Sequence, residues 1–76
     1  MEDLDSIQLK KIGNRLQELR LQKNLTQKEL AFLVDVEISQ ITRIERGIIN
    51  TSVLNLMKVV NALEISMSEF FKDIDF

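Results

Sequence analysis

Apolar residues recur three or four positions apart along most of the chain, which is the spacing of one face of an α-helix. The first such series predicts a helix from Ser6 to about Asn24. Its apolar members are Leu9, Ile12, Leu16 and Leu19. Residues 1–5 precede this pattern and are expected to form a flexible tail.

A second helix is predicted to begin at the sequence TQKE, residues 26–29. The Thr26 hydroxyl can accept a hydrogen bond from an amide of the first turn, and Glu29 can reach back to the start of the helix. This reciprocal arrangement is a capping box. The apolar residues that follow at helical spacing, and that we expect to be buried, are Leu30, Ala31 and Val34.

The apolar stretch AFLVDVEISQI, residues 31–41, contains two acids, Asp35 and Glu37. If one helix ran through it at roughly 100° per residue, Glu37 would fall on the buried face, where an unpaired carboxylate is costly. Aspartate is one of the few residues other than glycine that tolerate a left-handed turn conformation. We therefore predict that the chain turns a corner at Asp35 and that a new helix begins at Glu37.

This third helix, 37–46, is predicted to have two different faces. Ile41 and Ile44 lie on the side that faces the core. The opposite side carries a small apolar tip, two hydroxyls and two guanidinium groups, which belong to Ile38, Ser39, Thr42, Arg43 and Arg46. Gly47 stands where a left-handed C-cap is expected to end the helix.

Two further helices complete the pattern. Capping side chains in NTS, residues 50–52, precede a helix whose expected inward positions are Val53, Leu56, Met57, Val60 and Leu63. A second capping box, SMSE at 66–69, opens a short fifth helix, and its apolar residues are expected in the core: Met67, Phe70 and Phe71. The chain is thus predicted to be one all-α domain of five short helices over residues 1–76.

The composition excludes several classes of function. The chain has neither cysteine nor histidine, which removes disulfides, thiolate nucleophiles, most zinc sites and the side chain that most often transfers protons at neutral pH. No paired carboxylates stand in an evident cleft. We therefore expect no enzyme activity, no metal or other cofactor, and no small-molecule ligand.

The ends of the chain differ from its middle in charge. The net charge is −2, but residues 10–58 hold nine of the ten Lys and Arg against five acids, and each end carries an excess of three acids. This pattern leaves open an ordinary mixed surface and a nucleic-acid partner. The acidic N-terminus is unlike a signal peptide, and no apolar run approaches the ~18 residues that span a bilayer. A soluble cytoplasmic protein without membrane contact is expected.

With these elements assigned, the sequence resembles the Cro/phage-repressor type of helix-turn-helix regulator, the Xre family. The resemblance runs without gaps over residues 12–71, and its specific part is TQKELAFLVDVEISQITRIERG, residues 26–47. It implies a five-helix, lambda-repressor-like domain with the helix-turn-helix core at 26–46. It also implies double-stranded DNA as the partner, with the helix from 37 to 46 entering the major groove.

The resemblance implies a role for each matching residue. Base edges would be contacted by Ile38, Ser39, Thr42 and Arg43, because a guanidinium suits guanine and an isoleucine suits a thymine methyl. Phosphates would be contacted by Thr26, Gln27, Lys28, Arg46 and Asn50. The family also often carries a buried ion pair that fixes the angle of the recognition helix. The matching residues are Arg20 and Glu45, and two solvated surface charges are the alternative.

The sequence departs from the family pattern at several positions. Asp35 and Glu64 stand where glycine is usual, and Glu37 replaces the usual small hydroxyl cap. There its carboxylate would either accept from a cytosine amine or be repelled by phosphate. Apolar residues replace polar or basic ones at Phe32, Leu33, Ile48 and Ile49. These four form either a dimer or partner surface or a site covered by the tail or the last helix.

The resemblance implies a sequence-specific transcription regulator that acts as a homodimer on an operator with two half-sites ~34 Å apart. With no separate effector domain expected, its concentration or a protein partner would control it, as in regulators of restriction-modification, phage or toxin–antitoxin operons. The alternative is a protein-interaction module, of antitoxin or adaptor type, with weak DNA affinity on the same fold. The acidic ends, Glu37 and the Ile48–Ile49 pair favour that alternative.

Overall fold

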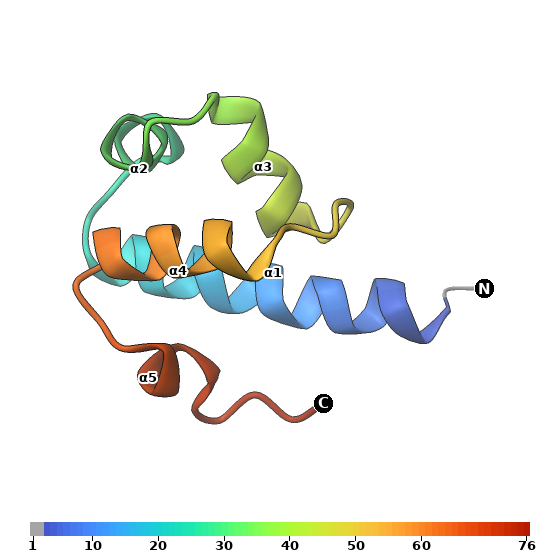
Figure 1. Cartoon of the computed structure of the whole chain (residues 1–76). Helices are drawn as coiled ribbons and strands as arrows, with labels where there is room; N and C mark the ends of the chain where they lie inside the picture. The colour runs from blue at the N-terminus through green and yellow to red at the C-terminus, as the bar shows by residue number, and fades with distance from the viewer. Residues whose placement is uncertain (1–2) are drawn as a thin grey trace.

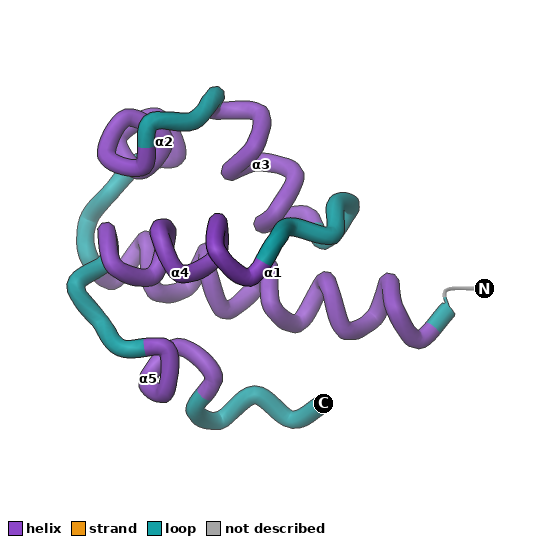
Figure 2. The backbone as a smooth tube through the Cα atoms, in the orientation of Figure 1, coloured by secondary structure: helices purple, strands orange, loops and turns teal. Residues whose placement is uncertain are grey.

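A computed structural model describes residues 3–76, and helices account for all the regular structure in that range. The helices are α1 (Leu4–Gln22), α2 (Gln27–Val34), α3 (Ile38–Arg46), α4 (Val53–Ala62) and α5 (Met67–Phe71). Figures 1 and 2 show α1 as a long rod, with α3 standing at an angle to it and α5 on the other side. This arrangement confirms the predicted all-α fold of five helices. None of the helices in residues 3–76 is long and apolar enough to cross a membrane.

The first helix begins earlier than predicted. The Asp3 carboxylate accepts a hydrogen bond from the Ser6 amide over 2.8 Å, and this bond lowers the pKa of Asp3. An acidic N-cap satisfies an amide of the first turn and complements the helix dipole, so the helix already includes Leu4 and Asp5. The predicted flexible tail is therefore wrong for residues 3–5, while residues 1–2 lie outside the described part of the chain.

The second helix begins and ends as the sequence predicted. Thr26 Oγ1 accepts from the Glu29 amide over 3.0 Å, and Glu29 Oε1 accepts from the Thr26 amide over 2.9 Å. The helix ends at Asp35, which has φ 61° and ψ 49° in the left-handed region. Glu37 then precedes α3 without a capping hydrogen bond from its side chain. The predicted corner at Asp35 is thus confirmed.

Other residues in the left-handed region also follow helices, and they are Asn24, Gly47, Glu64 and Asp73. Gly47 closes α3 at φ 71°, as predicted, and a Cβ on Gly47 would lie 2.7 Å from the Lys10 backbone. Only glycine satisfies both requirements without strain. Glu64 adopts φ 60° after α4, so an acid again occupies a conformation that glycine adopts most easily.

The core lies between the helices and is almost wholly aliphatic. Its buried apolar residues are Leu16, Leu19, Leu30, Ala31, Ile41, Ile44, Leu56, Val59, Val60, Leu63 and Phe70. Partly buried against it are several other positions that the sequence pattern assigned to the core: Ile12, Val34, Met67 and Phe71. The core therefore follows the predicted faces of all five helices, with exceptions on α4.

On α4, two predicted core positions are wrong. Val53 is 70% exposed and Met57 is 42% exposed, whereas Val59, which was not predicted, is buried. Met57 follows the buried Leu56 by one residue and so lies about 100° further round the helix. Val53 is the first residue of α4 and lines an open hollow of about 220 Å³ instead of filled core.

The C-terminal segment is fastened to α1 by two basic side chains. Arg15 donates from Nε to the Phe70 carbonyl and from Nη2 to the Glu69 carbonyl, each over 2.8 Å. Lys11 Nζ donates to the Asp75 carbonyl over 2.6 Å. The Arg15 bond to Phe70 satisfies a carbonyl in the last turn of α5, where a short helix lacks internal partners. The Lys11 bond holds the segment beyond α5 against α1.

Candidate nucleic-acid interface

The outer face of α3 carries the side chains that the sequence analysis singled out. Ile38, Ser39 and Arg43 are exposed, and Arg46 is exposed at the C-terminal end of the helix. The opposite face, with Ile41 and Ile44, is buried in the core. In Figure 1 the C-terminal end of α3 lies near α1, and its N-terminal end points away from α1, next to the loop from α2. Three of the four predicted base-contacting side chains thus share an accessible helix surface.

The guanidinium groups on this surface are available for an anion. Within residues 3–76, Arg43 and Arg46 take part in no ion pair and donate no hydrogen bond. Both lie in the last turn of α3, where a cation is also favourable to the helix dipole. The helix dipole explains why two positive charges are favourable at this end of α3. It does not provide hydrogen-bond acceptors for the two guanidinium groups, so their donors remain available.

The residues predicted to contact phosphate fall into two places. Thr26, Gln27 and Lys28 lie at the start of α2, and Arg46 and Asn50 lie at the end of α3 and in the loop after it. Lys28 and Asn50 are exposed. The Thr26 hydroxyl already accepts the capping bond from the Glu29 amide, although it retains a hydrogen to donate.

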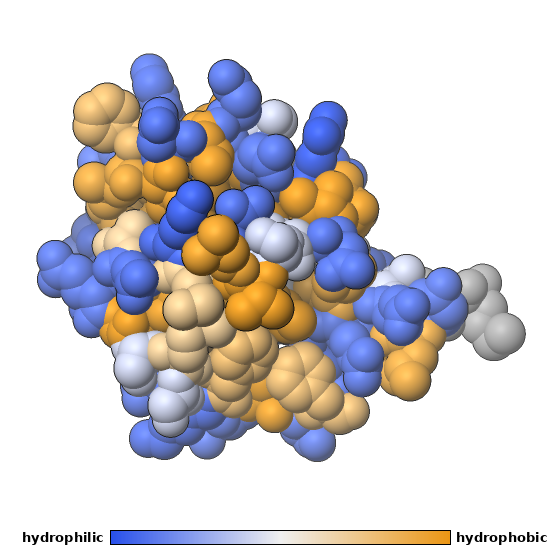
Figure 3. Space-filling model, in the orientation of Figure 1, coloured by the Kyte–Doolittle hydropathy of each residue, from blue (hydrophilic) through white to orange (hydrophobic). Residues whose placement is uncertain are grey.

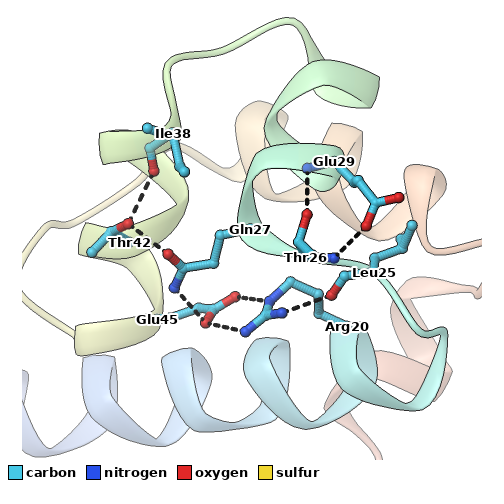
Figure 4. A network of polar contacts seen from close by, with 8 residues as sticks. All are labelled: Arg20, Leu25, Thr26, Gln27, Glu29, Ile38, Thr42 and Glu45. Atoms are coloured by element: carbon cyan, nitrogen blue, oxygen red, sulfur yellow. Dashed lines mark hydrogen bonds and ion pairs between the residues drawn. The ribbon is translucent and has the colours of Figure 1, made fainter.

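The predicted ion pair forms and lies inside the molecule. Arg20 Nε donates to Glu45 Oε2 over 2.7 Å, and Arg20 Nη2 donates to Glu45 Oε1 over 3.1 Å (Figure 4). Each residue is only 6% exposed. Arg20 Nη1 also donates to the Leu25 carbonyl over 2.7 Å. The pair joins α1 to the last turn of α3, and the surface alternative is excluded.

Gly13 adds a second link between the same two helices. A Cβ at this position would collide with the Ile44 carbonyl oxygen and lie 2.5 Å from that of Glu45. Only a residue without a side chain allows α1 to approach the backbone of α3 so closely. The sequence analysis did not give Gly13 this role, because a glycine inside a helical pattern does not by itself indicate which neighbour it faces.

A connection that the sequence analysis missed joins α2 to α3 through Gln27. Its Nε2 donates to Glu45 Oε1 over 3.0 Å, and its Oε1 accepts from Thr42 Oγ1 over 2.9 Å. Thr42 Oγ1 also lies 3.1 Å from the Ile38 carbonyl oxygen. Both Gln27 and Thr42 are half-buried. The available signal was the spacing of positions 42 and 45, which puts them on one face of a helix.

The apolar departures from the family pattern have different environments. Phe32 is 84% exposed and Leu33 is 56% exposed, and both line a shallow apolar groove on α2 with Leu25, Lys28 and Glu29. Ile48 is exposed, whereas Ile49 is partly buried against the core. The tail and the last helix therefore do not cover Phe32, Leu33 or Ile48 in the described part of the chain.

Two short helices that meet at a left-handed corner, the second exposing polar and basic side chains, define a DNA-binding helix-turn-helix protein. The comparison with protein families agrees, because the sequence profile of the family described as Helix-turn-helix matches residues 16–70. The chain belongs to this family. The assignment confirms the Xre-type resemblance and places the chain among DNA-binding transcription regulators, not among enzymes.

Several relatives share most of the chain. Control protein C.MunI of Mycoplasma sp is 38% identical over 66 residues, which cover 86% of this chain and 89% of that protein. The crystal structure of the restriction-modification controller protein C.AhdI from Aeromonas hydrophila has a TM-score of 0.82 and 43% identity, and the match covers 86% of this chain and 98% of that one. An uncharacterised HTH-type transcriptional regulator of Rickettsia conorii is 33% identical, but the match spans only 51% of its length.

Proposed function

We propose that the chain is a sequence-specific regulator that binds duplex DNA as a homodimer, with α3 in the major groove of each half-site. The observation that carries this proposal is the exposed outer face of α3, with Ile38, Ser39 and Arg43, which the Asp35 corner turns away from the core. An α-helix fits the major groove, where each base pair presents a distinct pattern of donors and acceptors.

Within this proposal, Ile38, Ser39 and Arg43 contact base edges. The Arg43 fork suits the two acceptors of guanine, and the Ile38 side chain suits a thymine methyl. Phosphates are contacted from both sides of that surface. The residues are Thr26 and Lys28 at the start of α2, Arg46 at the end of α3, and Asn50 in the loop after it. Gln27 and Thr42 were also expected at the DNA, and their contacts within the protein suggest the different role argued below.

The homodimer is supported by an apolar surface that the monomer leaves uncovered. On α4, Val53, Leu54 and Met57 are exposed, and Figure 3 shows apolar side chains gathered over α4 and the C-terminal segment below it. Phe71 continues this surface, because it lines the same hollow as Val53 and its ring contacts that of Phe76 at 6.2 Å between centroids. An apolar face of this kind fits the same face of a second copy under two-fold symmetry.

The homodimer has a direct test with a matched control. Leu54→Glu puts a charge on the α4 surface and is expected to make the chain monomeric in analytical ultracentrifugation. Leu33→Glu makes the same change on the α2 groove and is expected to leave the dimer intact. A monomeric wild type would refute the homodimer, and a dimer disrupted only by Leu33→Glu would move the interface to α2.

Control of a restriction-modification operon is the regulatory role that the comparisons favour. C.MunI is named a control protein and C.AhdI a restriction-modification controller protein, and the chain matches nearly the full length of both. The regulators that the chain matches over only part of their length carry additional sequence. We therefore propose that the chain controls a restriction-modification operon and that its concentration sets the occupancy of the operator.

A protein-interaction module with weak DNA affinity is the second candidate. The exposed Phe32 and Leu33 on α2 favour it, since they line one apolar groove and contiguous exposed apolar surface marks contact sites. It differs from the first candidate in one measurable property. A protein that contacts several phosphates loses affinity steeply with salt, because each contact adds roughly 0.9 to the slope of log affinity against log salt.

The experiment that tests the proposed function is selection of a preferred sequence from random duplex DNA, followed by affinity measurements at several salt concentrations. Arg43→Gln is expected to relax the preference at one base position, whereas Arg46→Gln is expected to weaken all duplexes alike and to lower the slope by about one phosphate contact. Lys72→Gln, beyond α5, removes the same charge away from the interface and is the control. If neither Arg43→Gln nor Arg46→Gln changes DNA affinity, the proposal is rejected.

A further inference from the structure

Gln27 uses both ends of its side-chain amide to bind α3. Nε2 donates to Glu45 Oε1 over 3.0 Å, and Oε1 accepts from Thr42 Oγ1 over 2.9 Å. In Figure 4 the amide lies between these two side chains, which project from successive turns of α3. A single residue in the first turn of α2 thus holds two positions on one face of the recognition helix.

The Glu45 side chain, which accepts one of these bonds, is itself held in place by Arg20 of α1. Its carboxylate is bound by Arg20 through two hydrogen bonds and is 6% exposed. Within residues 3–76, no buried side-chain nitrogen or oxygen is left without a hydrogen-bond partner. The buried part of this network has one preferred arrangement, because a rotation of α3 would break bonds to a carboxylate that is almost inaccessible to water.

The contacts made by Gln27 oppose rotation of α3 about its own axis. Apolar packing by Ile41 and Ile44 resists separation of α3 from the core, but it is less directional than hydrogen bonds. Rotation of α3 would shift Ile38, Ser39 and Arg43 together. Specific binding requires side chains to lie within roughly 0.5 Å of the positions that fit the DNA, so such a rotation would lower specificity.

We propose that Gln27 and Thr42 are positioning residues, which set the rotation of α3 and thereby the sequence specificity of the Ile38–Ser39–Arg43 surface. This inference rests on the proposed function, since it assigns the origin of specific binding. It departs from the family-based expectation, in which Gln27 donates to phosphate and Thr42 contacts a base.

The chemistry of the Thr42 hydroxyl favours positioning over base contact. The hydroxyl has one hydrogen, and both oxygens within hydrogen-bond distance, Gln27 Oε1 and the Ile38 carbonyl oxygen, belong to the protein. Donation to a base would therefore require breaking an existing bond. Gln27 is in the same situation, since a change of its orientation toward phosphate would remove a donor from the buried Glu45 carboxylate.

The test compares variants that keep shape and remove polarity. Gln27→Met and Thr42→Val are expected to lower the ratio of specific to non-specific DNA affinity by about tenfold, the order of the effect of losing one hydrogen bond. Non-specific affinity and the salt slope are expected to stay within about twofold of wild type. The double variant is expected to lose little more than either single variant, because both remove the same link. Lys28→Gln is the control for a phosphate contact and should weaken both kinds of duplex together.

Three results would overturn the proposal. The first is a parallel loss of specific and non-specific affinity in Gln27→Met, which would make Gln27 a phosphate contact. The second is a Thr42→Val effect confined to one base position, which would make Thr42 a base contact. The third is an unchanged affinity ratio in both variants. Each variant is measured at a temperature where circular dichroism shows it fully folded.

A readout on the free protein separates this proposal from the proposed function. In the DNA-free chain, both variants are expected to shift the same α3 backbone amide signals in nitrogen–proton correlation spectra, over residues 38–43. If the wild type binds no DNA, the proposed function fails, and these shifts still decide whether Gln27 and Thr42 position the helix. Changes confined to residues next to each substitution would refute the positioning role.

Discussion

Replacing Arg20 with alanine should strongly destabilise the protein. The Arg20 guanidinium makes two buried hydrogen bonds to Glu45 and a partly buried one to the Leu25 carbonyl. After Arg20→Ala, the Glu45 carboxylate keeps only the Gln27 amide as a partner. The Glu45 side chain is 3% exposed, so water does not replace the lost donors.

The magnitude follows from desolvation more than from the attraction itself. A buried ion pair gains little net stability over apolar residues of the same size, but removal of one partner leaves an uncompensated charge and costs about 3–5 kcal/mol. The loss would be a large share of the total, because a domain of 76 residues has a free energy of unfolding of roughly 4–11 kcal/mol at about 0.05–0.15 kcal/mol per residue.

Urea unfolding followed by circular dichroism measures this loss. Arg46→Ala is the matched control, since Arg46 is exposed and makes no ion pair within residues 3–76, and its change should stay within about 0.5 kcal/mol. Replacing both partners, as in Arg20→Met with Glu45→Leu, should recover much of the stability because no buried charge remains. If Arg20→Ala costs no more than Arg46→Ala, the assigned role of the pair is wrong.

Three further outcomes are expected. Gly13→Ala should lower the free energy of unfolding by about 1–3 kcal/mol, because the alanine Cβ would collide with the Ile44 carbonyl oxygen. This loss should exceed the gain of about 1 kcal/mol in helix propensity. A raised melting temperature would contradict the prediction. Asp35→Val should cost about 1–3 kcal/mol because Asp35 has φ 61°, whereas Asp35→Gly should not destabilise, and equal unfolding midpoints would show that the corner imposes no strain. The capping bond with the Thr26 amide holds the pKa of Glu29 below its usual range, so its contribution to stability is complete above the unfolded pKa of about 4.3 and is lost as the pH falls through the folded value. Acid unfolding of wild type and Glu29→Gln measures that contribution, and superimposable curves would argue against it.

Local signals in the sequence were sufficient for most of the fold. The Thr26 capping box, the acid at position 35 and Gly47 each act within a few residues, so the limits of α2 and α3 were predicted correctly. The start of α1 differs from the prediction although its signal is equally local, because an acidic segment at the end of a chain is typical of a tail as well as of a capped first turn.

Tertiary contacts were predicted less completely. The exposure of Val53 and Met57 depends on which neighbours cover α4, and helical spacing carries no information about that. The Arg20–Glu45 pair was predicted through family resemblance, whereas the Gln27–Thr42 contact joins residues whose side chains both suit DNA equally well. An amide and a hydroxyl bind phosphate, base or protein with similar geometry, so only the three-dimensional arrangement indicates their partners.

The central claim is that the corner at Asp35 presents the N-terminal half of α3 to DNA. Titration of the isotopically labelled chain with its selected duplex, followed by nuclear magnetic resonance, tests it most directly. The expected result is a set of signal changes centred on residues 38–43 and the first turn of α2, with intermolecular contacts from the Ile38 methyl groups to bases. Signal changes confined to the Phe32–Leu33 groove, or none at low salt, would contradict the claim.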